Sequence, residues 1–247
     1  MYPEIHLGSF QIPSYILYLS VLYCGLVFYA VTRAKRKNES VITTLDLALI
    51  LMLGGFVGAR LAHVLYESPE TYADNWIRIF QFWQGGFVFY GGFLLALIGC
   101  WIYLRRKDLS FFHWADFFAP IFALGYGLGR MSCFLAGCCY GSYCEQPWAV
   151  TFQWDQLAVP RHPTQLYAVI WELAIYALLI GLEKKSRPSQ GKIFSLWILF
   201  HGLGRLMMEH YREDFRGALI AGLTISTWIS LALISTSTYL LITRPKR

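Results

Sequence analysis

A lone arginine in a glycine- and cysteine-rich stretch is the strongest sign of chemistry in this chain. Arg130 is the one charged residue between Gly125 and Gly141, and apolar sequence lies on both sides of it. A guanidinium in apolar surroundings is costly unless an anion or a carboxylate meets it, and its planar donor fork matches a phosphate. We therefore expect this stretch to hold a phosphate. The structural alternative is that Arg130 pairs with Asp116 or Glu172 and only braces the fold.

The composition is typical of a polytopic membrane protein. Of 247 residues, 56% are hydrophobic and 15% are charged, whereas soluble domains have about 25% charged residues. Apolar segments long enough to cross a bilayer as helices lie at about 14–32, 43–66, 86–104, 115–135, 164–183, 193–209 and 219–242. We predict an all-α fold with seven transmembrane helices, forming a single integral membrane domain over residues 1–247. The fourth segment runs into the glycine stretch, where we expect the backbone to leave helical geometry.

The basic residues predict the orientation of these segments. Clusters that contain lysine lie at 33–37, 105–107, 184–192 and 244–247. With seven crossings all four clusters share one face, and the positive-inside rule makes that face cytoplasmic. The N-terminus is then periplasmic and the C-terminus cytoplasmic, with outer loops at about 67–85 and 137–163. Because the basic residues form short runs between apolar segments, the net charge of +6 does not indicate a nucleic-acid partner.

The basic residues outside these clusters are all arginines. They are Arg60, Arg78, Arg130, Arg161, Arg205, Arg212 and Arg216. Arginine stays charged and binds phosphate through two parallel donors, whereas lysine is a hydrated point charge. We expect several of them to line one anion-binding cavity that opens to the outer half of the membrane.

Six motifs, in one order along most of the chain, carry a family resemblance. They are Gly-Ala-Arg-Leu-Ala-His-Val at 58–64, Trp-Gln-Gly-Gly-Phe-Val-Phe-Tyr-Gly-Gly at 83–92, Asp-Phe-Phe-Ala-Pro at 116–120, the Gly-Arg stretch at 129–141, Arg-His-Pro-Thr-Gln-Leu-Tyr at 161–167 and Gly-Arg-Leu-Met-Met-Glu-His-Tyr-Arg-Glu at 204–213. Together they resemble the prolipoprotein diacylglyceryl transferases of bacterial inner membranes. The resemblance implies that phosphatidylglycerol donates its diacylglyceryl group to a prolipoprotein cysteine thiol and that glycerol phosphate leaves. It also implies an active site facing the outer leaflet and no metal or organic cofactor.

The resemblance assigns roles to individual residues. Arg130 and Arg205 match the family's two essential arginines, expected at the lipid phosphate. The substrate-binding candidates are Arg60, Gly91, Gly92, Gly141, His162, Glu209 and Arg212, with Cys133 and Cys138 at signature positions. An alternative for Gly91 and Gly92 is that they serve only close helix packing.

The chain departs from the family where the acceptor would be activated. Tyr90 replaces the histidine of a His-Gly-Gly motif, which is the favoured general base. The other departures are Cys133, Ala136 and Cys138 in place of asparagines and a glutamate, Ala168 in place of a glutamate, and His201 in place of a tyrosine. The outer segment between Gly141 and Arg161 is also short. The residues expected to bind the phosphate match the family motifs, whereas the residues expected to activate the acceptor thiol differ from them.

Attack by a thiol requires thiolate, so the missing histidine matters. A free cysteine near pKa 8.5 is only slightly ionised at neutral pH, and tyrosine with a pKa near 10 is a poor base. His201 lies four residues before Arg205 and shares its helix face. We hypothesise that His201 and Tyr90 have exchanged positions around one cavity, with His201 as base and Tyr90 as hydrogen-bond donor. The alternative is that His201 only hydrogen-bonds a neighbouring helix.

Three cysteines fall in the predicted outer segment, at Cys138, Cys139 and Cys144. Because that compartment is oxidising, a disulfide from Cys144 to Cys138 or Cys139 is the leading interpretation. Alternatively, Cys133 or Cys138 is a nucleophile of low pKa that forms a covalent lipid intermediate. A zinc site is a weaker alternative, since the spacing lacks a CxxC pattern and no histidine is close in sequence.

Three functions follow from these features. The first is the transferase reaction itself, and the second is transfer from the same phospholipid donor to a different acceptor. The third is a phospholipid-binding membrane protein without enzymatic activity, which would apply if no base exists.

Overall fold

The computed structural model describes residues 4–7, 10–73, 75–81, 85–153, 155, 157–185, 188–212 and 221–243, with side chains from residue 14 onward. Trp83 and Gln84 of the second motif, Glu213 of the sixth motif and Arg216 lie outside these residues.

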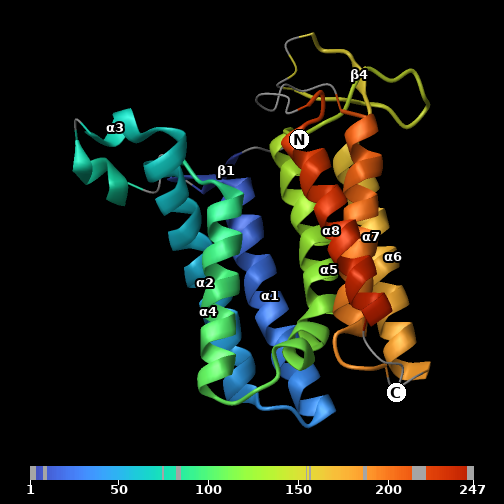
Figure 1. The fold of residues 1–247 in the computed structure, drawn as a ribbon. Coiled ribbons are helices and arrows are strands. Elements are labelled where there is room, and N and C mark those ends of the chain that lie inside the picture. Colours follow the sequence, from blue (N-terminus) through green and yellow to red (C-terminus); the bar gives the residue numbers. More distant parts are fainter. Residues whose placement is uncertain are drawn as a thin grey trace. The chain divides into compact units, whose positions relative to one another are not determined.

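Helices form at all seven of the apolar segments (Figure 1). They are α1 (Ser14–Lys37), α2 (Val41–Ala62), α4 (Phe89–Arg106), α5 (Phe111–Ala136), α6 (Thr164–Lys185), α7 (Lys192–His210) and α8 (Ile225–Thr243). Five spans in the described part are long and apolar enough to cross a membrane: α1, α2 with its π-helical extension (His63–Glu67), α5, α6 and α8. The protein is therefore a mostly helical, multi-pass membrane protein.

Three details differ from the expectations. Helix α5 continues through the glycines to Ala136, so the backbone leaves the helix only at Gly137, whose φ is 71°. Helix α8 begins at Ile225, because Ala221 and Gly222 have positive φ. Two short antiparallel strand pairs accompany the helices: β1 (Glu4–Leu7) with β2 (Phe10–Pro13), and β3 (Val150–Thr151) with β4 (Pro160–Arg161).

The chain divides into two compact units, Met1–Leu26 with Phe112–Arg247 and Val27–Phe111. In the second unit, α2 and α4 pack with their backbones close together. A Cβ on Gly91 would meet the carbonyl of Gly58, and one on Gly92 would meet the carbonyl of Gly55. These glycines therefore permit the helix contact, as small residues commonly do in membrane proteins. The same unit contains α3 (Pro69–Ala73) and a 3-10 helix (Trp76–Phe80) in the predicted outer loop.

In the first unit, α5, α6 and α7 surround a buried apolar core, formed by Ala119, Ala123, Ile175, Leu179 and Ile193, and α8 packs against α7. At one end, Asp116 accepts hydrogen bonds from the backbone N–H of Gly191 and Phe194, at 2.6 and 2.8 Å. This carboxylate joins the beginnings of α5 and α7.

At the other end of the same unit, the segment after α5 meets α6 and α7. The N–H of Gly141 donates to His162 O at 2.9 Å, and the N–H of Ser142 donates to Tyr211 O at 2.8 Å. The ends of α5 and α7 therefore lie with the beginning of α6, and this end carries most of the predicted site residues.

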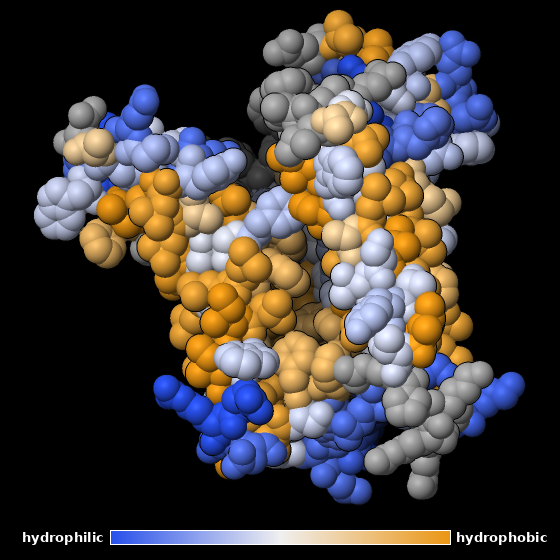
Figure 2. Space-filling view, viewed as in Figure 1, coloured by the Kyte–Doolittle hydropathy of each residue, from blue (hydrophilic) through white to orange (hydrophobic). Residues whose placement is uncertain are grey.

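The surfaces of both units fit a bilayer environment. Figure 2 shows apolar side chains over the helices and hydrophilic side chains gathered near helix ends. Large apolar side chains on the helices are exposed, such as Phe28 at 72% and Ile42 at 73%. Such exposure is expected where lipid, rather than water, is the neighbour.

The segment between α5 and α6 is folded against this end of the first unit. Phe152 is fully buried and stacks with Tyr140 at 4.8 Å between ring centroids. Arg161 donates from Nε and Nη2 to the Asp155 carboxylate at 2.8 and 3.0 Å. This bidentate pair closes the loop that joins β3 to β4, since Asp155 lies between the two strands.

Candidate functional site

Arg130 meets an aromatic partner, not a carboxylate. Its Nη2 donates to the Tyr126 hydroxyl at 2.5 Å, and its guanidinium carbon lies 4.8 Å from the centre of the Tyr126 ring. Tyr126 is four residues earlier on α5, so one face of the helix carries both side chains. The sequence analysis missed Tyr126, although its i−4 spacing from Arg130 was a usable signal.

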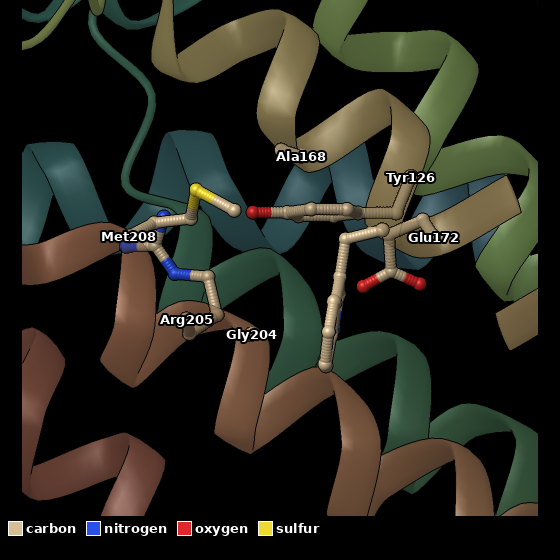
Figure 3. Close-up of a pocket in the computed structure, with 7 residues that line it drawn as sticks. Tyr126, Ala168, Glu172, Gly204, Arg205 and Met208 are labelled. Atoms are coloured by element: carbon tan, nitrogen blue, oxygen red, sulfur yellow. The ribbon is translucent and has the colours of Figure 1, made fainter. Parts of the chain in front are cut away.

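Tyr126 also lines a small pocket that contains the second predicted arginine (Figure 3). The lining residues are Tyr126, Ala168, Trp171, Glu172, Gly204, Arg205 and Met208. Nη2 of Arg205 donates to the Ser226 hydroxyl on α8 at 2.9 Å. The indole of Trp171 fits directly over Gly204 and donates to Phe200 O at 2.9 Å. Tyr126 therefore connects Arg130 to the pocket that Arg205 lines, and the shared phosphate site stays a prediction.

The carboxylates that were alternative partners of Arg130 are engaged elsewhere. Asp116 binds the first amides of α7, and Glu172 accepts from His201. The structural alternative that paired Arg130 with Asp116 or Glu172 is wrong. Among the described residues, neither Arg130 nor Arg205 lies within ion-pair distance of a carboxylate. Both cations are thus placed to attract an anionic ligand.

His201 forms a short hydrogen bond between helices. Its Nδ1 lies 2.5 Å from Oε1 of Glu172, and the edge of its ring faces Tyr126 at 4.6 Å between centroids. A carboxylate acceptor favours the tautomer with hydrogen on Nδ1, which leaves Nε2 as a proton acceptor. The predicted interhelical hydrogen bond is therefore confirmed, and its geometry is also that of an oriented base. The catalytic role of His201 stays a prediction.

The guanidinium of Arg60, on α2, is bound by backbone carbonyls of the loop that follows this helix. Its guanidinium donates to the backbone carbonyls of Arg78 at 2.6 Å, Ile79 at 3.0 Å, Gln81 at 3.3 Å and Gly86 at 3.1 Å, and also to that of Gly85. Arg60 is only 7% exposed, so these carbonyls replace water around the buried charge. In this structure Arg60 shapes the loop after α2, and its role in substrate binding stays a prediction.

The other candidates of the second unit lie at the beginning of α4. Tyr90 is 43% exposed, and its ring meets Phe89 at 5.6 Å between centroids. Gly91 and Gly92 pack closely against α2. The exchange of positions between Tyr90 and His201, and lipid contact at Gly91 and Gly92, stay predictions.

Three further candidates, Gly141, His162 and Glu209, make close contacts within the first unit. A Cβ on Gly141 would meet Tyr211 O and the side chains of Thr164 and His162, so this signature glycine is required by close approach. Nδ1 of His162 lies 3.0 Å from the Tyr167 hydroxyl. Glu209 accepts from the Thr224 hydroxyl at 2.7 Å. Substrate contacts of Gly141, His162, Glu209 and Arg212 stay predictions.

The cysteines are arranged differently from the leading expectation. All six are free in the structure, and Cys144 is buried with its N–H bonded to Pro160 O at 3.0 Å. The predicted disulfide between Cys144 and Cys138 or Cys139 is therefore wrong. Instead, the sulfur atoms of Cys133, Cys138 and Cys139 all lie within 4.8 Å of one another. The sequence analysis missed this grouping because a turn, not a helix or strand, creates it.

The electrostatics of this group single out Cys139. Hydrogen bonds from the Cys133 and Cys138 thiols lower the pKa of Cys139, and the charges of Arg212 and Arg130 act in the same direction. The hydrogen bond with Cys133 raises the pKa of Cys138. The alternative of a covalent lipid intermediate on Cys133 or Cys138 stays a prediction.

Comparisons with known proteins agree with the motifs. The family model described as prolipoprotein diacylglyceryl transferase matches residues 4–243. Three similar relatives carry the name phosphatidylglycerol–prolipoprotein diacylglyceryl transferase. The relative from Methylobacillus flagellatus is 34% identical over 98% of this chain and 96% of its own length. The relative from Bordetella avium is 34% identical over 88% and 83%, and that from Nitrosomonas europaea is 36% identical over 85% and 77%.

Proposed function

The chain belongs to the prolipoprotein diacylglyceryl transferase family, and we propose that it transfers the diacylglyceryl group of phosphatidylglycerol to a cysteine thiol of a prolipoprotein. Glycerol phosphate is the leaving group. One observation carries the proposal: Arg130 donates to Tyr126, which lines the same pocket as Arg205, and neither arginine has a carboxylate partner among the described residues. The alternative of a protein without enzymatic activity is set aside because the family consists of transferases.

The two arginines act on the donor lipid. Each guanidinium offers donors to the phosphate oxygens, and the Tyr126 hydroxyl holds Arg130 in position. As the carbon–oxygen bond to the phosphate breaks, negative charge grows on the departing glycerol phosphate. Preorganised cations stabilise that charge more than they stabilise the intact diester.

His201 acts on the acceptor. Glu172 holds its ring by the 2.5 Å hydrogen bond, and Nε2 takes the proton of the attacking thiol. The thiolate then forms the carbon–sulfur bond as the phosphate leaves. In the sequence, Tyr90 stands where the family usually has its histidine base.

The protein crosses the bacterial inner membrane seven times, with the N-terminus periplasmic and the C-terminus cytoplasmic. Helices α4 and α7 join the five spans of highest hydropathy. Their polar residues, such as Arg205 and Glu209 on α7, are of the kind that marks functional sites within membranes. The substrate pocket then opens toward the outer leaflet.

Complementation of a bacterium depleted of its own transferase tests this proposal, with mass analysis of a model lipoprotein as the readout. The wild-type chain is expected to restore the diacylglyceryl modification. Arg130→Ala and Arg205→Ala should each reduce transfer about 100-fold or more, as loss of a charge-stabilising donor does in other enzymes. Arg105→Ala, at an exposed arginine of α4, is the matched control and should retain activity.

A second candidate function keeps the donor and changes the acceptor. The specific observations in its favour are Tyr90 at the usual histidine position and the short outer segment. Purified protein would then consume phosphatidylglycerol and release glycerol phosphate in the presence of its true acceptor, whereas the model lipoprotein would stay unmodified. Failure of well-expressed wild-type protein in the complementation assay would favour this second function over the first.

A further inference from the structure

The three grouped cysteines come from a tight turn at the end of α5. The turn follows Ala136, and both Gly137 and Cys139 adopt the left-handed region, with φ of 71° and 64°. The N–H of Cys138 donates back to Cys133 O at 3.0 Å. This reversal returns Cys138 and Cys139 to the last turn of the helix, where Cys133 lies, even though the spacing contains no CxxC pattern.

Helix α6 fixes the turn from the other side. The Gln165 amide donates to Cys138 O at 2.6 Å, and the Thr164 hydroxyl donates to Cys139 O at 2.9 Å. Gln165 and Thr164 are 1% and 3% exposed. Because both backbone carbonyls are held by buried side chains, the positions of the three sulfur atoms are preorganised.

The sulfur geometry suits one thiophilic metal ion. Three thiolates bound to tetrahedral zinc at about 2.3 Å from the metal lie about 3.8 Å from one another, and the three sulfurs here lie within 4.8 Å. Small side-chain rotations therefore bring them to ligand distance. All three thiols are free.

Two guanidiniums lie near the sulfur atoms. Arg130 is one helical turn before Cys133 on α5, and Arg212 interacts electrostatically with Cys139. Three thiolates with one divalent ion carry a net charge of −1, which the neighbouring guanidiniums offset. Soft thiolate ligands select zinc or copper(I) over magnesium or calcium.

We propose that Cys133, Cys138 and Cys139 bind one zinc ion and that the fourth ligand is the thiolate of the acceptor cysteine. Three protein ligands and one exchangeable position are typical of catalytic zinc sites. Cys138 is exposed, so a ligand can approach from outside. This inference rests on the proposed function, and it replaces the expectation of a metal-free site.

A zinc ion at these cysteines activates the acceptor thiol, which Tyr90 cannot do as a general base at neutral pH. A thiol that coordinates zinc loses its proton, and at this exposed end of the site the proton is released to water. The coordinated sulfur then attacks the diacylglyceryl carbon: a carbon–sulfur bond forms, the carbon–oxygen bond to phosphate breaks, and glycerol phosphate leaves with the electron pair. Arg130 lies one helical turn before Cys133, so the phosphate site and the sulfur site are adjacent.

Metal content tests the site without any need for turnover. Protein purified in detergent, without metal-affinity resin, should carry about one zinc ion per chain by elemental analysis. Cys138→Ser should lose the zinc, and the matched control Cys24→Ser, at another exposed cysteine, should keep it. A wild-type chain that stays free of zinc after incubation with zinc salt, or that has a disulfide within the group, would overturn the proposal.

Cobalt substitution tests the fourth ligand. Cobalt(II) in the site should give thiolate-to-metal charge-transfer absorption, which a lipobox peptide containing cysteine should change and the same peptide with serine should not. Identical spectra with both peptides would refute acceptor coordination. If the cysteine peptide changes the spectrum but no diacylglyceryl product ever forms, the proposed function fails while the metal site stands.

Discussion

At the scale of single residues, Tyr126 connects the groups that matter most. Its hydroxyl accepts from Arg130, its ring meets His201, and it lines the pocket with Arg205. A single aromatic side chain thus adjoins both phosphate candidates and the candidate base.

Removal of the Tyr126 hydroxyl should weaken the donor site selectively. In Tyr126→Phe the ring stays, but Arg130 loses a charge-assisted hydrogen bond, which is worth about 1.5–3 kcal/mol in other proteins. We expect kcat to fall about tenfold or more, while KM for phosphatidylglycerol changes less, because Arg130 stabilises the charge of the leaving group more than the intact lipid. Initial rates in mixed micelles measure this. A change confined to KM would contradict a role in positioning Arg130 for charge stabilisation.

Substitution of His201 by glutamine separates its two possible roles. Glutamine can keep a hydrogen bond to Glu172 but cannot accept a proton from a thiol at neutral pH. If His201 is the base, His201→Gln and His201→Ala should both lose transfer activity about 100-fold or more. If the side chain only joins α6 to α7, glutamine should restore the activity that alanine loses, and the exchange with Tyr90 would be refuted.

At the scale of elements, the close contact between α2 and α4 depends on glycine, which has no side chain. The carbonyl of Gly55 fills the space that a Cβ on Gly92 would need, whereas a Cβ on Gly55 itself would meet nothing within 4 Å. Gly55 and Gly92 both lie at the contact between α2 and α4, but only a side chain at Gly92 would collide with the other helix.

This difference predicts opposite tolerance to substitution. Gly92→Ala should destabilise the protein by about 1–3 kcal/mol, because α4 must move away from α2. Gly55→Ala should leave stability unchanged or slightly raised, since alanine favours helix. Thermal unfolding in detergent compares them. Equal melting temperatures for the two variants would contradict the packing of α2 against α4.

The outer segment between α5 and α6 should depend on pH through one ion pair. The Arg161 guanidinium lowers the pKa of Asp155 below its ordinary value of 3.8. A lowered carboxylate pKa stabilises the folded state above the ordinary value, and this contribution disappears as pH falls through the folded pKa. The segment should therefore be protected at neutral pH and should open only below about pH 4.

Limited proteolysis of the outer segment checks this expectation. Wild-type protein should resist cleavage between Gly141 and Arg161 at pH 7 and lose resistance to an acid-active protease as pH falls below about 4. Asp155→Asn should be cleaved at neutral pH, because the ion pair is already absent. Equal resistance of the variant and the wild type at pH 7 would show that the pair does not hold the loop.

At the scale of the whole molecule, the number of crossings decides which face each loop occupies. With seven crossings, the loops after α4 and after α6 are cytoplasmic. If only the five spans of highest hydropathy crossed, both loops would be periplasmic, although the termini would lie on the same sides in either case.

Reporter fusions at these two loops therefore distinguish seven crossings from five, whereas fusions at the termini give the same result for both. We expect a reporter inserted near Asp108 and one inserted near Ser189 to be active only in the cytoplasm, as the basic residues at both places indicate. A reporter within 142–160 should be active only in the periplasm. Periplasmic activity at Asp108 would exclude α4 as a membrane span.

The sequence alone determined the membrane class, the positions of the seven helices and the family, because apolar length and linear motifs are local properties of the chain. It also made Arg130 and Arg205 the leading site candidates, since charges in apolar segments stand out without a structure. Tertiary structure decided their shared neighbour Tyr126, the partner of His201, the commitment of Arg60 to its loop and the grouping of Cys133, Cys138 and Cys139. These depend on helix rotation and on a left-handed turn, and neither hydropathy nor residue spacing specifies such geometry.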